Sequence, residues 1–126
     1  ISATCLRVAA ADGHIASVSI GLGKNISEKE FIDAIRNYNN PIAELNLPSA
    51  PKQFMKYFGE EDRPQTKLDR NFEKGMGITV GRLRKDPILG WKFVSLSHNT
   101  IRGAAGGAIL TAELLKARGY IYSGRN

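Results

Sequence analysis

Apolar and polar residues alternate in several short stretches of the chain, which is the spacing of a β-strand with one buried face. Residues 4–8 and 16–20 alternate in this way and are separated by Asp12-Gly13, a strong turn signal, so they predict a hairpin. Further strands are predicted, with less regular alternation, at residues 53–58, 76–84 and 91–96.

Helical spacing begins after the predicted hairpin. Ser27 and Glu30 form a capping-box pattern, and Phe31, Ile35 and Tyr38 follow three or four residues apart. This arrangement predicts an amphipathic helix of about three turns that packs on the sheet. The polar stretch at residues 59–71 predicts a long surface connection, and connections of this length inside compact domains tend to be functional.

A second helix is predicted over residues 101–118 and ends at Gly119. It contains Gly103, Gly106 and Gly107, each of which costs a helix interior about 1 kcal/mol relative to alanine. Close approach of the helix backbone to the protein's own sheet, or to a ligand, would explain these glycines. The whole order is β-β-α-β-β-β-α, which predicts an α+β domain with helices on one face of a mostly antiparallel sheet.

Composition narrows the class of protein. A chain of 126 residues forms one domain or part of one, and no apolar run reaches the roughly 18 residues that span a membrane. The net charge of +6 is scattered, with its densest groups at residues 67–70 and 82–85. Because aromatic residues do not interleave these groups, a solvated surface or a site for small anions is favoured over nucleic acid binding.

The few cysteine and histidine residues bear on compartment and metal chemistry. One cysteine allows no intrachain disulfide and is typical of a reducing compartment, so we expect a cytoplasmic protein. Two histidines and one cysteine far apart in the sequence predict no metal site. The chain opens on strand-like sequence without an initiator methionine, which suggests a fragment of a longer protein.

Arg7 and His14 are the candidate chemical groups, seven residues apart across the predicted turn. The planar guanidinium of arginine suits a two-pronged grip on a carboxylate, and histidine can both take and give a proton near neutral pH. A surface hairpin with a solvated arginine and a hydrogen-bonded histidine would show the same spacing, so spacing alone leaves both interpretations open. Cys5 shares the Arg7 face of its predicted strand, and we interpret it as a packed thiol rather than a nucleophile. Asn99 and Thr100 precede the last helix, where free N–H groups favour polar or anionic partners.

Three stretches together resemble one family. They are Ile1–Arg7 running on to the Ala-Asp-Gly-His that ends at His14, Glu61–Gln65 running on to Leu68–Arg70, and Leu96–Gly107. They are similar to the C-terminal part of the aspartate-semialdehyde dehydrogenases, in the branch shared by fungi and archaea. The arginine and histidine with six residues between them, followed by Asn-x-x-Arg-Gly-Ala-Ala, are jointly the most specific signal.

The resemblance implies a fold like the C-terminal domain of glyceraldehyde-3-phosphate dehydrogenase and a homodimer or higher homo-oligomer. It implies reduction of L-aspartyl 4-phosphate to L-aspartate 4-semialdehyde, with release of phosphate and with NADP bound mostly by an N-terminal domain. By the same resemblance Arg7 binds the substrate α-carboxylate, His14 is the catalytic acid and base, and Asn99 lies near the nicotinamide. Neither a metal, a nucleic acid nor a membrane is implied.

One departure qualifies the resemblance. The nucleophilic cysteine of the family lies well upstream of the stretch that matches Arg7, and Cys5 does not correspond to it. The dinucleotide-binding glycine loop also has no counterpart in the sequence. Residues 1–126 are therefore expected to be a substrate-binding and dimerisation fragment that is inactive by itself.

Two alternatives remain beside this interpretation. A related acyl reductase, acting on malonyl-CoA or on an N-acetylglutamyl phosphate, could keep the histidine and asparagine positions. The other alternative is a dimerisation or basic binding module without catalysis, and the net charge is its only support.

Overall fold

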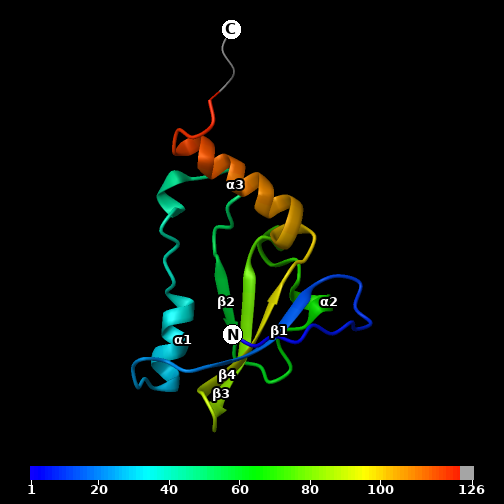
Figure 1. The fold of residues 1–126 in the computed structure, drawn as a ribbon, viewed down its shortest axis with the longest axis vertical. Coiled ribbons are helices and arrows are strands. Elements are labelled where there is room, and N and C mark those ends of the chain that lie inside the picture. The colour runs from blue at the N-terminus through cyan, green and yellow to red at the C-terminus, as the bar shows by residue number, and fades with distance from the viewer. Residues whose placement is uncertain (123–126) are drawn as a thin grey trace.

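A mixed sheet forms the centre of the molecule (Figure 1). The computed structural model describes residues 1–122, and within them the sheet has four strands in the order β1-β4-β3-β2. The strands are β1 (His14–Ile20), β2 (Met55–Phe58), β3 (Ile78–Asp86) and β4 (Gly90–Ser97). β4 pairs antiparallel with both β1 and β3, whereas β2 pairs parallel with β3. The predicted α+β class with a mostly antiparallel sheet is confirmed, with one parallel pair that the sequence did not predict.

The parallel pair follows from the connection between β2 and β3. Two parallel strands need a long crossover, and residues 59–77 provide it, including the one-turn helix α2 (Thr66–Asp69). The crossover covers the sheet face opposite α1. Gly81 of β3 points toward it, and a Cβ at Gly81 would clash with the carbonyl of Arg63. Helical structure therefore covers both faces of the sheet, not one face as predicted.

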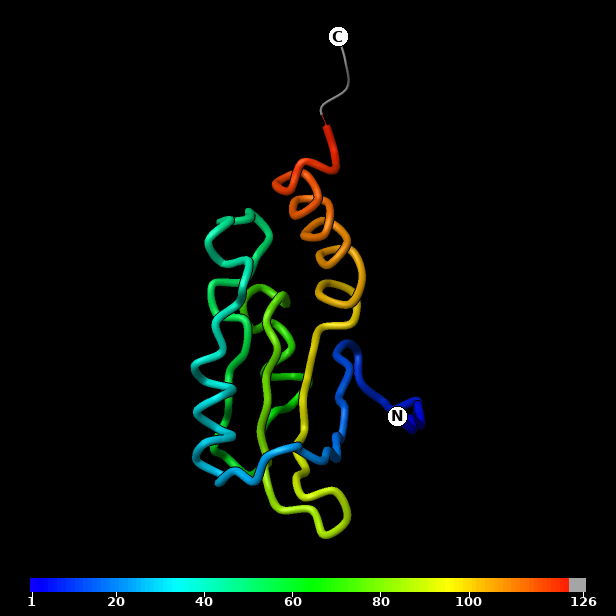
Figure 2. Tube along the Cα trace, turned by 60° about the vertical axis from the view of Figure 1, so that its left-hand side comes forward, coloured from blue at the N-terminus to red at the C-terminus, as the bar shows by residue number. Residues whose placement is uncertain are grey.

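Helix α1 (Glu28–Arg36) covers the other face (Figure 2). Phe31 and Ile35 are buried against Val80, Leu83 and Trp91 of the sheet, and this cluster is the larger of two apolar cores within the described residues.

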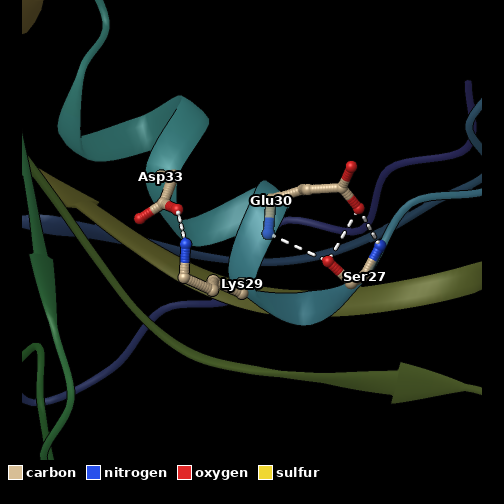
Figure 3. A network of polar contacts seen from close by, with 4 residues as sticks. All are labelled: Ser27, Lys29, Glu30 and Asp33. Atoms are coloured by element: carbon tan, nitrogen blue, oxygen red, sulfur yellow. Dashed lines mark hydrogen bonds and ion pairs between the residues drawn. The ribbon is translucent and has the colours of Figure 1, made fainter.

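The predicted capping box at the start of α1 is present. The Ser27 N–H donates to the Glu30 carboxylate at 2.7 Å, and the Glu30 N–H donates to the Ser27 hydroxyl at 3.2 Å (Figure 3). The Ser27 hydroxyl also donates to the Glu30 carboxylate at 2.7 Å. This bond, together with the one from the Ser27 N–H, lowers the pKa of Glu30. The helix therefore begins where the sequence predicted.

Helix α3 (Gly106–Ala117) lies across one end of the sheet instead of on a face (Figure 1). It packs there through Leu110, which forms a second apolar cluster with Leu47 and Met76. The helix predicted over 101–118 does not start as an α-helix, because residues Ile101–Ala105 form a π-helix. Within residues 1–122, no helix is both long and apolar enough to cross a membrane.

The predicted strand at residues 4–8 is wrong, and with it the hairpin. Residues 1–13 form no strand, and Leu6 and Val8 are exposed by 82% and 67%. Alternation of apolar residues makes a strand only where a neighbouring backbone accepts and donates the ladder hydrogen bonds. Within the described residues, β1 pairs only with β4, and no strand pairs with residues 4–8.

Candidate functional site

His14 lies at the exposed start of β1, so its position at a strand end agrees with the sequence prediction. It is paired in register with Ser97, the last residue of β4. The preceding Gly13 has φ +104, in the left-handed region that favours glycine. The chain bends at residues 11–12 and enters β1 after this glycine, but it does not form the predicted turn between two strands.

Arg7 lies in the segment before β1 and is exposed. Within residues 1–122, no hydrogen bond joins it to His14 or Asn99. Its guanidinium is therefore available to a ligand, and convergence of Arg7 and His14 on one cleft stays a prediction.

The structure brings Asn99 into contact with Gly13, the residue that precedes His14. Asn99 follows the end of β4, and its Oδ1 atom accepts a hydrogen bond of 2.8 Å from the backbone N–H of Gly13. Gly13 and Asn99 are 86 positions apart in the sequence. Sequence reasoning missed this contact, because only the antiparallel pairing of β1 with β4 places the two strand ends side by side.

His98 was not assigned a role from the sequence, and the structure gives it one. It is buried, with 6% of its surface exposed. Its ring Nδ1 atom accepts a hydrogen bond of 3.4 Å from the Ile101 N–H and lies 3.3 Å from the Thr100 hydroxyl. Its carbonyl accepts the Gly103 N–H at 3.0 Å, a bond of the π-helix. His98 therefore fixes the turn that leads from β4 into the helix.

The glycines of this helix have two explanations. A Cβ at Gly106 would lie 2.5 Å from the Met76 sulfur, and one at Gly107 would clash with the Arg102 carbonyl. Gly103 differs, because its nearest neighbour would be the His98 carbonyl oxygen at 3.6 Å. Gly106 and Gly107 thus allow close internal packing. Gly103 is not required by packing, because a side chain added there would extend into open space.

An open hollow of about 550 Å³ lies along the start of this helix. Small residues dominate its lining, which consists of Arg102, Gly103, Ala104, Gly107, Ala108, Leu110 and Thr111. A second hollow lies beneath the 48–52 loop and includes Glu73 and Lys74. Neither hollow includes Arg7, His14 or Asn99, so neither by itself forms a pocket around the predicted site residues.

The 59–71 connection holds an ion pair with a buried carboxylate. Arg63 contacts both oxygens of Asp69, with Nε 2.8 Å from Oδ2, and the Gln65 N–H donates to the same oxygen at 2.7 Å. Burial by itself would raise the pKa of Asp69, but the Arg63 and Gln65 hydrogen bonds outweigh it and lower the pKa. These charges bind one another and cross-link the connection internally, which is a structural role.

Cys5 is exposed, not packed as predicted, because its segment is not a strand. Among residues 1–122, no three His, Cys, Asp or Glu side chains are grouped so that they could hold a metal ion.

Comparison with known proteins defines the class. Residues 1–102 match the family model for the semialdehyde dehydrogenase dimerisation domain, and the chain belongs to this family. It is 43% identical over 126 residues to an aspartate-semialdehyde dehydrogenase of Aspergillus fumigatus, covering 96% of this chain and 35% of that protein. It is 44% identical over 115 residues to the Archaeoglobus fulgidus enzyme of the same name, covering 91% of this chain and 32% of that protein. The chain thus spans about a third of the length of these relatives.

The fold leads to the same family. The crystal structure of aspartate semialdehyde dehydrogenase with NADP from Candida albicans superimposes with a TM-score of 0.76 and 40% identity. The match covers 87% of this chain and 31% of that one. The resemblance identified from the sequence is therefore confirmed, with relatives in both fungi and archaea.

Proposed function

We propose that this chain is the substrate-binding and dimerisation part of an NADP-dependent aspartate-semialdehyde dehydrogenase of the cytoplasm. The reaction proposed is reduction of L-aspartyl 4-phosphate to L-aspartate 4-semialdehyde with release of phosphate. The observation that carries the proposal is the family match over residues 1–102, together with 43–44% identity to enzymes of that name.

In this proposal Arg7 binds the substrate and His14 transfers protons. The exposed Arg7 guanidinium binds the α-carboxylate through two parallel hydrogen bonds and so fixes the orientation of the acyl group. His14, at the exposed end of β1, takes the proton from a nucleophile supplied outside residues 1–126 and returns one to the tetrahedral intermediates. Arginine remains charged at every working pH, whereas histidine changes protonation near neutrality, so the two roles are not interchangeable.

NADP is assigned here mainly to a domain outside this chain. The residues after Asn99 fit contact with one end of such a cofactor, because four of the seven residues that line the hollow at the start of the helix are glycine or alanine and Gly103 has open space around it. The bound nicotinamide supplies the hydride. The Gly13 bond uses the oxygen of the Asn99 amide and leaves its NH₂ group as a donor that such a cofactor could accept from.

Assembly into a homodimer is part of the same proposal. It is supported by the description of the matching family as a dimerisation domain. It is also supported by Ile15 of β1, a large apolar residue of the sheet that is 51% exposed.

The experiment that tests the function compares substrates in the full-length enzyme. NADPH formation from NADP is measured with aspartate semialdehyde and phosphate. It is measured in parallel with N-acetylglutamate semialdehyde and phosphate, and with malonate semialdehyde and coenzyme A. We expect kcat/KM for aspartate semialdehyde to exceed the others by at least about 100-fold. All three substrates carry a carboxylate, but they differ in chain length and in the α-amino group, so the competitors bound through Arg7 would place the reacting carbonyl away from His14. A higher kcat/KM with either competitor would replace the proposal by the corresponding acyl reductase.

A further inference from the structure

The amide of Asn99 connects the end of β4 to the loop that carries His14. Its oxygen accepts the Gly13 N–H at 2.8 Å, one residue before the histidine. We propose that Asn99 is a positioning residue for His14, which fixes the backbone from which the imidazole projects. The inference rests on the acid and base role proposed for His14. The NH₂ end of the Asn99 amide is proposed above to contact the nicotinamide, and the inference gives the oxygen end of the same amide a separate function.

The connection is needed because the strand ladder stops at His14. His14 pairs with Ser97, and residue 13 lies beyond the last pair of the β1–β4 ladder. The left-handed Gly13 turns the chain at this point, so ladder hydrogen bonds do not set the orientation of its peptide group. The Asn99 bond extends the contact between the two strand ends by one residue and thereby defines the direction in which the chain enters β1.

Packing holds the same glycine from a second side. A Cβ at Gly13 would lie 3.1 Å from both Leu96 Cδ1 of β4 and Thr66 Cγ2 of α2. The backbone of Gly13 is thus enclosed by the sheet, by α2 and by the Asn99 amide. A substitution at Gly13 would combine backbone strain with crowding, so the contact is better tested from Asn99.

Asn99 is itself held in place by its neighbours. The buried His98 accepts the Ile101 N–H on one side of Asn99, and the His98 carbonyl accepts the Gly103 N–H. These bonds fix the turn in which Asn99 lies. A positioning group must have its own backbone fixed in this way if it is to hold a second loop within the tolerance that catalysis requires.

The test uses the full-length enzyme with three variants. Asn99→Ala removes the acceptor, Asn99→Asp keeps an oxygen that can accept the Gly13 N–H, and Asn40→Ala is the matched control. The Asn40 side chain also accepts a backbone N–H, that of Ile42 at 3.2 Å, in a loop away from β1. The measurements are hydrogen exchange resolved to the Gly13 amide, KM for NADP, and kcat over a range of pH with both substrates saturating.

In Asn99→Ala we expect exchange of the Gly13 amide to be at least about fivefold faster, as loss of one ordinary hydrogen bond implies. Its kcat should fall at least about tenfold, with a shifted pH profile, because a small displacement of a catalytic group has a large effect on rate. Asn99→Asp should keep the Gly13 protection, and its kcat should fall clearly less than that of Asn99→Ala, because only the NH₂ end of the amide is lost. Asn40→Ala should change neither. Asn99→Ser, too short to reach Gly13, gives the same expected result if the alanine variant does not fold.

Three results would overturn the inference. They are unchanged Gly13 exchange in Asn99→Ala, faster exchange with unchanged kcat, and a rise in KM for NADP as the only kinetic effect. A loss of kcat in Asn99→Asp as large as in Asn99→Ala, with Gly13 still protected, would also overturn it. An inactive wild-type enzyme would instead refute the proposed function, and the exchange measurement would still show whether Asn99 holds Gly13.

Discussion

At the residue scale, two arginines of the chain, Arg63 and Arg7, differ in their partners. Arg63 is bound to the buried Asp69 and belongs to the structure of the 59–71 connection. Arg7 is exposed before β1 and is not hydrogen-bonded to the other candidate site residues among those described. The difference in partners, which the sequence alone does not show, separates a structural guanidinium from one available to a substrate.

Replacing Arg7 by lysine tests the carboxylate role in the full-length enzyme. Lysine keeps the positive charge but loses the planar pair of donors. We expect kcat/KM for the aspartyl substrate to fall at least about tenfold with the fold intact, because one charge-assisted hydrogen bond contributes about 1.5–3 kcal/mol. Arg118→Lys, at an exposed arginine that ends α3, is the control and should leave the kinetics unchanged. Normal kinetics for Arg7→Lys would mean that Arg7 does not orient the substrate.

Asp69→Asn tests the buried ion pair through the pH dependence of stability. The pKa of Asp69 is lowered in the folded state, so its carboxylate stabilises the fold above its unfolded-state pKa, about 3.9. The contribution is lost as the pH falls through the lower, folded-state value. We expect the variant to lower the free energy of unfolding by about 2 kcal/mol at pH 7 and by much less near pH 2, measured by urea denaturation. Asp62→Asn, at an exposed carboxylate of the same connection, should have little effect at either pH.

Residues with local partners were predictable, and residues with distant partners were not. The Ser27–Glu30 capping box spans three positions, so its pattern is visible in the sequence and is present in the structure. The contact of Asn99 with Gly13 spans 86 positions and depends on strand pairing. The role of His98 depends on burial beneath the helix start, which no local pattern indicates.

At the scale of elements, the predicted strands are present where a neighbouring strand pairs with their backbone. Residues 76–84 and 91–96 alternate and form β3 and β4, whose mutual pairing buries one another's apolar side chains. Residues 4–8 alternate more regularly and form no strand, because no neighbouring strand within residues 1–122 pairs with them. Amphipathic pattern reports which side chains can be buried, whereas a strand also requires a partner for its backbone.

The glycines of the last helix give an element-scale prediction. Gly107→Ala places a methyl group against the Arg102 carbonyl and should destabilise the protein by about 1–3 kcal/mol, since the π-helix must shift. Gly103→Ala meets its nearest atom at 3.6 Å and should be neutral or slightly stabilising, because alanine favours helices over glycine. Thermal unfolding of the two variants beside wild type measures the difference. Equal destabilisation of both would show that the π-helix is not what requires glycine at position 107.

At the scale of the whole molecule, one face of the sheet is covered and the other face is covered only in part. Helix α1 covers one face and the 59–77 crossover covers part of the other, while α3 closes one end (Figure 2). Ile15 of β1 pairs with Leu96, so its side chain lies on the face opposite α1, and it is 51% exposed. β1 is also an edge strand of the described sheet, which leaves backbone groups unpaired along one side.

These features lead to a prediction for the 126-residue chain studied alone. No turnover of aspartate semialdehyde is expected, because its only cysteine, Cys5, does not match the family nucleophile and no dinucleotide-binding loop is present in the sequence. NADPH formation with aspartate semialdehyde and phosphate should stay at background. Turnover by this chain would assign the nucleophile to Cys5, which Cys5→Ser would then abolish.

The same chain should self-associate through the open face of its sheet. Burial of Ile15 against a second copy removes apolar surface from water and covers the β1 edge. Light scattering at micromolar concentration should therefore give a mass well above the 13.8 kDa of the monomer. Ile15→Glu should lower this mass toward the monomer, because a charge buried at the contact has no partner. Ile109→Glu, at an α3 residue that is similarly exposed at 55%, should leave it unchanged. A monomeric wild-type chain, or equal dissociation by the two substitutions, would show that the sheet face is not the contact.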